Sequence, residues 1–369
     1  MGDKIKIIMT ADTLGGVWTY AIGLCRSLQA YNFEIHLVTM GKWLSEHQNK
    51  EVRELDHVTL YESNLKLEWM EDPWEDITLA KEWIGEIYRK VQPDIMHFNN
   101  YAQVSSQWQC SILTVFHSCV LTWHTAVRGR CAPSRWNRYK AMVESALFLS
   151  DSVVFPSEAI KSQALREYGS IARAEVIYNG FDSPTTIIPE KLPVVLSAGR
   201  IWDEAKNTAL LCRIAPLLTW PVKIAGDQGE NSDPALAHGN VTFLGQLPNK
   251  GLLEHMREAS IFMMPAKYEP FGLAVLEAAG SGCALALSAI STLQEVWGEA
   301  AVYFDPDDRE DALRVVQNLI DDDHLRRTLS QKAKDKAAVF TAERMAAQYR
   351  AVYKRLLAEH NVENLSQTL

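Results

Sequence analysis

One stretch decides how the chain folds: YEPFGLAVLEAAGSG, at residues 268–282. The Glu-Pro pair disfavours helical backbone at Glu269, whereas Pro270 fits the first turn of a helix. Small and apolar residues follow, and Gly280 and Gly282 suit a helix C-terminus. The pattern therefore predicts a helix that begins at about Phe271 and ends near Gly280.

A helix that begins there presents the free backbone N–H groups of Phe271, Gly272 and Leu273 to whatever lies in front of it. Together with the helix dipole they form an anion site, which Gly272 lets a phosphate approach closely. Glu269 and Glu277 bracket the site, up to roughly 12 Å apart at about 1.5 Å per residue. That is about the reach of a nucleotide sugar. The alternative is an ordinary capped helix that carries one solvent-exposed glutamate.

The length and composition favour two globular domains. The chain has 369 residues, of which 47% are hydrophobic and 22% charged, so it can form sizeable cores. The net charge of −9 argues against a nucleic-acid partner and against strong adsorption to anionic membranes through overall charge. An anionic substrate would therefore need local positive charge.

The cysteines and the hydropathy pattern predict a soluble, cytoplasmic protein. The six cysteines are scattered without a Cys-x-x-Cys pair, which is typical of reduced core thiols and not of a disulfide framework or a zinc site. No apolar run reaches the length of a transmembrane helix, and no signal sequence precedes the first predicted strand.

The N-terminal half alternates predicted strands and helices, beginning with a strand at 4–9 and a helix that runs to about Gln29. Gly15 and Gly16 lie in the turn between them. This is the layout of a phosphate-binding crossover, but the sequence is not Gly-x-Gly-x-x-Gly, so it gives a dinucleotide site little support. The two glycines either let a substrate approach the backbone or only permit a tight turn. Residues 42–76 show weak structure signals.

Three histidines are candidates for a site. The predicted strands at 94–98 and 111–118 carry His97 and His117, and His124 follows shortly after. Because ligands of open α/β sheets bind at the carboxyl edge of the strands, His117 at a strand tip ranks first. The alternative for each is a structural residue with satisfied hydrogen bonds.

Residues 128–140 hold the one basic cluster, which includes Arg128, Arg130, Arg135 and Arg138. It is interpreted either as a weak contact with an acceptor phosphate or a membrane surface, or as a solvated loop that enters a helix. The second interpretation is favoured.

The alternation pauses between residues 181 and 192, where Pro184 and Pro189 flank a polar segment, and this predicts a domain boundary. A new strand at 193–199 is followed by a loop that carries Arg200 and Lys206. Two cations in a strand-to-helix loop can clamp a diphosphate, arginine by its planar fork and lysine as a point charge.

The second half continues with strands and ends in helices. The predicted strands lie at 223–226, 241–245, 261–265, 283–287 and 301–304. Asp321–Asp323 superficially resembles an Asp-x-Asp metal motif, but its place between two helical patterns favours a helix cap. Residues 341–358 form a long amphipathic helix.

Glu269 and Glu277 form a Glu-x7-Glu motif in the setting Glu-Pro-Phe-Gly-Leu-x-x-x-Glu-Ala. With Gly199-Arg200…Lys206, Tyr178–Asp182 and Phe243–Gly245, the chain resembles the retaining group 1 glycosyltransferases of the large fourth family, over its whole length and most strongly in the C-terminal half. The resemblance implies an α/β protein of GT-B architecture, with two Rossmann-like, doubly wound domains facing a central cleft. Residues 1–180 would bind the acceptor and 181–340 the donor, and a helix within 341–369 would cross back to the first domain.

The resemblance also implies roles for the residues of the second domain. Glu269 would contact hydroxyl groups of the donor sugar, and Glu277 the ribose. Arg200 and Lys206 would hold the diphosphate, with help from the amides of Phe271, Gly272 and Leu273.

Further roles follow from the same resemblance. Gly15 and Gly16 would border the donor phosphates, His117 would lie near the reacting sugar, and the backbone at Leu247 would line the base. Many members have Asp directly after the histidine, whereas this chain has Ser118.

The expected function is retaining transfer of a hexose from a UDP- or GDP-linked sugar to a hydroxyl acceptor, without metal or other cofactor. The acceptor is a small molecule, a glycan or a lipid-linked molecule. The alternatives are a hydrolysing nucleotide-sugar epimerase, which would convert the donor without an acceptor, and a catalytically silent sugar-nucleotide binding protein.

Overall fold

The computed structural model describes residues 4–182, 189–229 and 239–367. The described chain divides into two compact units, each built on one parallel sheet. Unit 1 contains the residues up to Thr125, Arg130–Gly180, and the chain from Ala342 onward. Unit 2 contains Phe181–Thr341 together with Ala126–Gly129. Residues 183–188 of the predicted linker lie outside the described residues.

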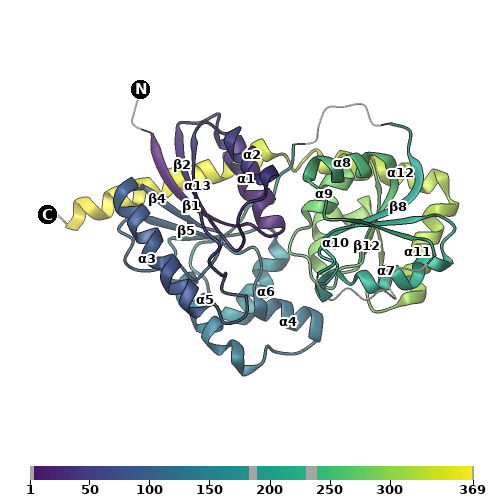
Figure 1. Cartoon of the computed structure of the whole chain (residues 1–369), viewed down its shortest axis with the longest axis horizontal. Helices are drawn as coiled ribbons and strands as arrows, with labels where there is room; N and C mark the ends of the chain where they lie inside the picture. The colour runs from purple at the N-terminus through teal and green to yellow at the C-terminus, as the bar shows by residue number, and fades with distance from the viewer. Residues whose placement is uncertain (1–3, 183–188, 230–238, 368–369) are drawn as a thin grey trace. The chain divides into compact units, whose positions relative to one another are not determined.

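Unit 1 is organised around a seven-stranded parallel sheet with the order β3-β2-β1-β4-β5-β6-β7 (Figure 1). The strands are β1 (Ile5–Asp12), β2 (Phe33–Met40), β3 (Val58–Glu62), β4 (Ile95–Phe98), β5 (Ser111–Val115), β6 (Ser152–Phe155) and β7 (Ala174–Val176). The helices are α1 (Gly16–Leu28), α2 (Glu46–Arg53), α3 (Trp74–Val91), α4 (Val120–Arg128), α5 (Asn137–Leu149), α6 (Glu158–Tyr168) and α13 (Ala342–Gln367). The central strands carry buried apolar runs because helices cover both faces of such a sheet, as the complete burial of Ile7, Ile8 and Met9 in β1 illustrates.

The C-terminal helix α13 belongs to unit 1, where it packs beside α1 (Figure 1). Its Tyr349 and Tyr353 are fully buried, and the Tyr353 hydroxyl lies 2.6 Å from Nδ1 of His97 in β4. Ser111 of β5 donates a hydrogen bond of 3.2 Å from its hydroxyl to the carbonyl oxygen of Leu356. The last helix of the chain therefore completes the core of the first sheet.

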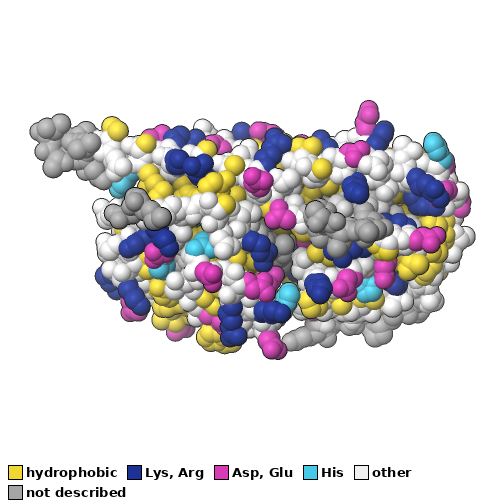
Figure 2. All heavy atoms as spheres, turned by 90° about the horizontal axis from the view of Figure 1, so that it is seen from above, with side chains coloured by type: hydrophobic (Ala, Val, Ile, Leu, Met, Phe, Trp, Pro, Cys, Tyr) yellow, Lys and Arg dark blue, Asp and Glu magenta, His cyan; other side chains and the backbone are white. Residues whose placement is uncertain are grey.

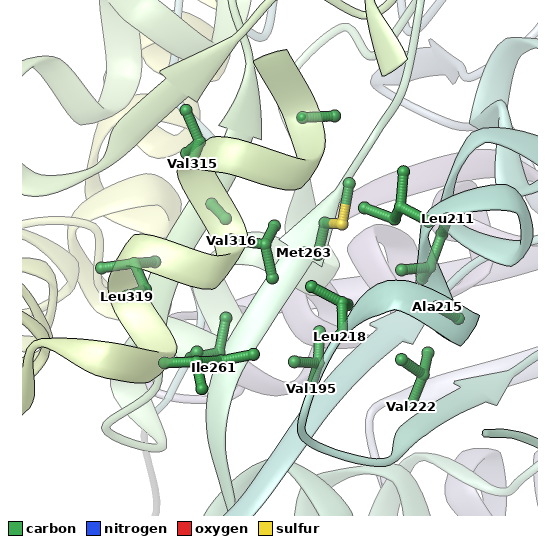
Figure 3. Packing of buried hydrophobic residues seen from close by; sticks show 14 of the residues in the cluster. Val195, Leu211, Ala215, Leu218, Val222, Ile261, Met263, Val315, Val316 and Leu319 are labelled. Carbon is green, nitrogen blue, oxygen red and sulfur yellow. The ribbon is translucent and has the colours of Figure 1, made fainter. Parts of the chain in front are cut away.

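Unit 2 contains a six-stranded parallel sheet with the order β10-β9-β8-β11-β12-β13. The strands are β8 (Leu192–Ala198), β9 (Val222–Ala225), β10 (Val241–Gly245), β11 (Ala259–Met264), β12 (Ala284–Ser288) and β13 (Val302–Phe304). The helices are α7 (Thr208–Ile214), α8 (Asn249–Glu258), α9 (Leu273–Gly280), α10 (Ser291–Trp297), α11 (Arg309–Asp321) and α12 (Asp323–Ala337). Figure 3 shows one layer of its core, in which side chains of β8, β9 and β11 pack against α7 and α11. The predicted doubly wound α/β fold is confirmed for both units.

Several local predictions are resolved by the structure. Residues 42–76 are more regular than their weak signals indicated, since they contain α2 and the edge strand β3. The Ser45 hydroxyl accepts a hydrogen bond from the backbone of Gln48, whose side chain in turn accepts one from the Ser45 N–H, and this capping box starts α2. The carboxylate of Asp322 caps α12 by accepting from the N–H of Leu325 at 2.8 Å, as predicted for the acidic triplet.

The cysteines follow the prediction with one exception. All six are free, and five are buried, but Cys131 is exposed. No helix in the parts of the chain that the structure describes combines the length and apolar character needed to cross a bilayer.

The sheet order reverses between β1 and β4 in unit 1 and between β8 and β11 in unit 2. At such switch points the loops that leave the two central strands turn in opposite directions, and the crevice between them is where open α/β sheets bind ligands. In unit 2 the first of these loops runs from Gly199 to Lys206, and the second follows Met264.

The loop after β8 is held in place by a close backbone contact. The N–H of Gly199 donates to the carbonyl oxygen of Ala225, and a Cβ added at Gly226 would lie 1.8 Å from the carbonyl oxygen of Gly199. Gly226 has a φ of +145°, a value that side chains rarely tolerate. Only glycine fits at this position.

We expect Gly226→Ala to lower the free energy of unfolding by about 3 kcal/mol or more, because the methyl group forces two backbone segments apart. Gly23→Ala in α1 is the control, since nothing lies within 4 Å of a Cβ at Gly23 and alanine favours helix. The measurement is the urea midpoint of each variant. An unchanged midpoint for Gly226→Ala would show that the contact at Gly199 does not constrain the loop.

Candidate functional site

Lys206 and Glu269 form the centre of the candidate site in unit 2. Lys206 ends the short 3₁₀ helix η2 (Glu204–Lys206) in the loop after β8, and Glu269 lies in the loop between β11 and α9. The backbone N–H of Lys267 donates to the carbonyl oxygen of Ala205 at 2.8 Å and joins the two loops. Nζ of Lys206 then lies 2.5 Å from Oε2 of Glu269, and both side chains are more than four-fifths buried.

The other carboxylate oxygen of Glu269 occupies the helix N-terminus. Its Oε1 accepts a hydrogen bond of 3.1 Å from the N–H of Gly272, so this N–H is not free as the sequence predicted. The helix also begins two residues later than expected, at Leu273, because Gly272 takes the left-handed conformation as its N-cap, with φ +89°. Glu269 therefore pairs with the charge of Lys206 and accepts the hydrogen bond of the Gly272 N–H, the two groups that were expected to bind a phosphate.

Arg200 is the more accessible of the two predicted diphosphate ligands. Its Nη2 donates to Oδ2 of Asp203 at 2.7 Å, while Oδ1 of Asp203 accepts from the N–H of Ala205 at 3.0 Å. Burial alone would raise the pKa of Asp203, but the nearby guanidinium of Arg200 and the ammonium of Lys206 outweigh burial and lower it. Asp203, which the sequence did not single out, thus fixes the shape of the cationic loop. Two-fifths of the Arg200 side chain is still exposed to solvent.

Glu277 is buried in α9 rather than solvent-exposed as an ordinary capped helix would have it. Its Oε1 accepts a hydrogen bond of 3.0 Å from Nδ2 of Asn249, the first residue of α8. Burial raises the pKa of Glu277 to about 7, and the bond from Asn249 opposes this rise only in part. Leu247, whose backbone was predicted to line the nucleotide base, lies two residues before Asn249. The hydrogen bond from Asn249 to Glu277 therefore holds the start of α8, next to Leu247, against α9.

The predicted residues of unit 1 lie at the carboxyl edge of its sheet. Gly15 and Gly16 follow β1, and both are exposed at the start of α1. His117 lies two residues beyond the end of β5. Its Nε2 is 2.8 Å from Oδ1 of Asn99, which follows β4, and burial lowers its pKa to about 3. The ring of Tyr20 packs edge-on against His117, with 4.6 Å between the ring centroids.

The other two histidine candidates differ from His117 in position. His97 is a core residue with no exposed surface, held between the hydroxyl groups of Tyr353 and Tyr20. The structural interpretation therefore holds for His97. His124 lies on α4 beside Trp123 and Trp136.

The basic segment 128–140 is largely partnered within the chain. Arg128 pairs with Glu204 at 2.6 Å, and the guanidinium of Arg138 lies 3.7 Å from the centre of the Trp74 ring. Away from this segment, the face drawn in Figure 2 also shows side chains of both charges interspersed. These contacts favour a structural role for the segment.

The described residues bring no three His, Cys, Asp or Glu side chains together as a metal site would require.

Two family models match the chain. "Glycosyl transferases group 1" matches residues 181–336 and "Glycosyltransferase Family 4" matches residues 14–183, so that together they span most of its length. The chain belongs to the group 1 glycosyltransferases. The sequence-based identification of the chain as a group 1 glycosyltransferase is therefore confirmed.

Individual relatives agree with this assignment. Glycogen synthase of Mycobacterium tuberculosis is 28% identical over 260 residues, which are 63% of this chain and 62% of the relative. The match thus spans about three-fifths of that curated relative.

Solved structures show the same GT-B fold. Sucrose-phosphate synthase from Thermosynechococcus elongatus superimposes with a TM-score of 0.80 at 20% identity, over 96% of this chain and 100% of the other. HepE from Anabaena, solved in complex with UDP-glucose, gives a TM-score of 0.75 at 14% identity, over 95% of this chain and 100% of the other.

We expect Glu277→Gln to stabilise the protein in a pH-dependent manner. A carboxyl group whose pKa is raised from 4.5 to about 7 by folding destabilises the folded state as the pH rises through this interval. Removing the charge should therefore raise the free energy of unfolding by about 3 kcal/mol at pH 8 and by under about 1 kcal/mol at pH 5. The measurement is the melting temperature at both pH values.

Glu254→Gln is the matched control, because it makes the same substitution at an exposed position on α8. Equal shifts in melting temperature at pH 5 and pH 8 for Glu277→Gln would contradict the burial argument.

Proposed function

We propose that this protein transfers a hexose from a UDP- or GDP-linked sugar to a hydroxyl acceptor, with retention of configuration at the anomeric carbon. The observation that carries the proposal is the convergence of Arg200, Lys206 and Glu269 at the switch point of unit 2. Two cations and a carboxylate in two adjoining loops suit a ligand in which a diphosphate is bonded to a hydroxyl-rich ring. The resemblance of HepE, which was solved with UDP-glucose, supports a donor of this class.

In this proposal, Arg200 and Lys206 bind the diphosphate and stabilise the negative charge that builds up as it leaves. Preorganised positive charge at a leaving group is a large contribution to catalysis. Donor binding requires Lys206 to exchange Glu269 for phosphate oxygens, and it leaves Glu269 free to accept hydrogen bonds from the hydroxyl groups of the sugar. In this exchange Lys206 pairs with phosphate instead of carboxylate. Glu269 loses its ion pair, and hydrogen bonds from the sugar hydroxyl groups and from the N–H of Gly272 then compensate its charge.

The remaining predicted residues act at the two ends of the donor. Glu277 accepts hydrogen bonds from the ribose hydroxyl groups, which favour its ionised form, and the backbone near Leu247 lines the base. The amides of Phe271, Gly272 and Leu273 and the glycine turn at Gly15 and Gly16 border the phosphates. His117 contacts the reacting sugar.

The acceptor is a small molecule, a glycan or a lipid-linked molecule. In the last case, exposed arginines of segment 128–140 supply a weak contact with the membrane surface.

Lys206→Ala and Glu269→Ala should each lower turnover by about 100-fold or more, because each removes a charge that acts on the donor. The measurement is release of UDP from UDP-glucose and of GDP from GDP-mannose in the presence of a panel of hydroxyl acceptors. Circular dichroism checks that each variant is folded.

Lys267→Ala is the matched control, because Lys267 lies in the same loop but its ammonium pairs with the exposed Asp307. It should retain turnover to within about twofold, as exposed ion pairs contribute little. Turnover at the wild-type rate in Lys206→Ala would refute the site, and nucleotide-sugar conversion without any acceptor would favour an epimerase.

The transfer should also proceed at its full rate in excess EDTA. The reason is that Arg200 and Lys206 already supply the positive charge that a divalent ion provides in metal-dependent transfer. The assay is the same release of UDP or GDP, with and without chelator. A loss of activity that Mn²⁺ or Mg²⁺ restores would contradict metal independence.

A further inference from the structure

The side-chain amide of Asn99 has a fixed orientation at the switch point of unit 1. Its Nδ2 lies 2.7 Å from the carbonyl oxygen of Thr10 in β1, and its backbone N–H donates to the hydroxyl of the same threonine at 3.0 Å. A carbonyl oxygen only accepts hydrogen bonds, so the NH₂ group must point toward Thr10. The amide oxygen is therefore directed to the other side, where it lies 2.8 Å from Nε2 of His117.

This orientation determines which ring nitrogen of His117 carries a proton. An amide oxygen cannot donate, so Nε2 of His117 must be the donor in the hydrogen bond to Asn99. Because burial lowers the pKa of His117 to about 3, the ring is neutral near pH 7 and carries a single proton. Nδ1 is then left with a lone pair, and among the described residues it has no hydrogen-bond partner.

Among the described residues, burial is the one cause of the lowered pKa of His117, and no charged side chain contributes to it. Tyr20 from α1 packs against the His117 ring, and Tyr349 from α13 packs against both Tyr20 and His97 from β4. Burial lowers the pKa of His97 to about 3 as well. The edge-on contact with Tyr20 also restricts rotation of the His117 ring.

We propose that Asn99 is a positioning residue that locks His117 in the neutral Nε2–H tautomer, so that Nδ1 accepts a hydrogen bond from a hydroxyl group of the donor sugar. The second half of this statement rests on the proposed function. A neutral acceptor nitrogen attracts a hydroxyl group but not a phosphate, whose oxygens have no proton to donate near neutral pH. His117 therefore selects for the sugar, in contrast to the cations Arg200 and Lys206.

The tautomer can be observed directly in the unmodified protein. Two-bond ¹H–¹⁵N correlation spectra of the ¹⁵N-histidine-labelled full chain distinguish the two neutral tautomers and the imidazolium, and His117→Gln identifies the His117 signals by their loss. We expect the Nε2–H pattern throughout pH 6–8. The Nδ1–H pattern, the imidazolium, or an exchanging mixture would overturn the proposal, whatever the protein transfers.

Asn99→Asp then tests the role of the lock. A carboxylate beside Nε2 stabilises the imidazolium, so Nδ1 becomes a donor and loses its lone pair. We expect the imidazolium signature at pH 7 and a loss of at least tenfold in kcat/KM for the nucleotide sugar. The matched control is Asn100→Asp, because the Asn100 side chain bonds to Thr10 and Gln103 and not to His117. It should leave the His117 signature unchanged.

The outcomes separate this proposal from the proposed function. The expected signature in the wild type, combined with an unchanged kcat/KM in Asn99→Asp, would overturn the role of Nδ1. Failure of the wild type to turn over any nucleotide sugar would refute the proposed function, while the spectra would still decide the tautomer.

Discussion

The parallel direction of all strands in each sheet is the constraint on which the candidate site depends. It brings the carboxyl ends of neighbouring strands to one edge, and the reversal of strand order separates the two loops there. In unit 2 this arrangement brings Lys206 and Glu269 within 2.5 Å although 63 residues separate them in the sequence. The same geometry in unit 1 brings Thr10, Asn99 and His117 together from three different strand ends. In both sheets, the strand order thus determines which side chains lie close together at the carboxyl edge.

Burial controls the protonation of the key polar groups differently in the two units. In unit 2, Lys206 and Glu269 compensate each other, whereas Glu277 has only the neutral partner Asn249 and its pKa rises to about 7. In unit 1, burial holds His117 neutral, and the direction of one amide selects its tautomer. Under the proposed function, a charged donor would therefore meet charged groups in unit 2, whereas His117 would offer only a neutral acceptor.

The sequence was sufficient to predict the doubly wound fold, because buried parallel strands appear as short apolar runs such as that of β1. It was weakest where the pattern depends on local side-chain contacts. The edge strand β3 is only partly buried, and α2 is a short polar helix that begins with the Ser45 capping box, so neither stands out by hydrophobic periodicity. The sequence was sufficient to predict the motif residues of the site. It did not predict the hydrogen bond from Gly272 to Glu269, because this bond requires Gly272 to take the left-handed conformation, after which α9 begins only at Leu273. Asp203, Asn249 and Asn99 were also missed, because the role of each depends on the hydrogen bonds that its side chain makes in the folded protein.

The position of α13 has a consequence for how the chain matures during synthesis. Unit 1 begins at the N-terminus, yet the buried Tyr349 and Tyr353 reach it only after all of Phe181–Thr341 has been made. Domains generally fold as they leave the ribosome, N-terminal ones first. Here that order is reversed: unit 2 has its whole sequence available while the first sheet still exposes the apolar surface that α13 will cover. A nascent or truncated chain that lacks this helix consequently leaves apolar surface of the first sheet uncovered, even though every strand of both sheets has been translated.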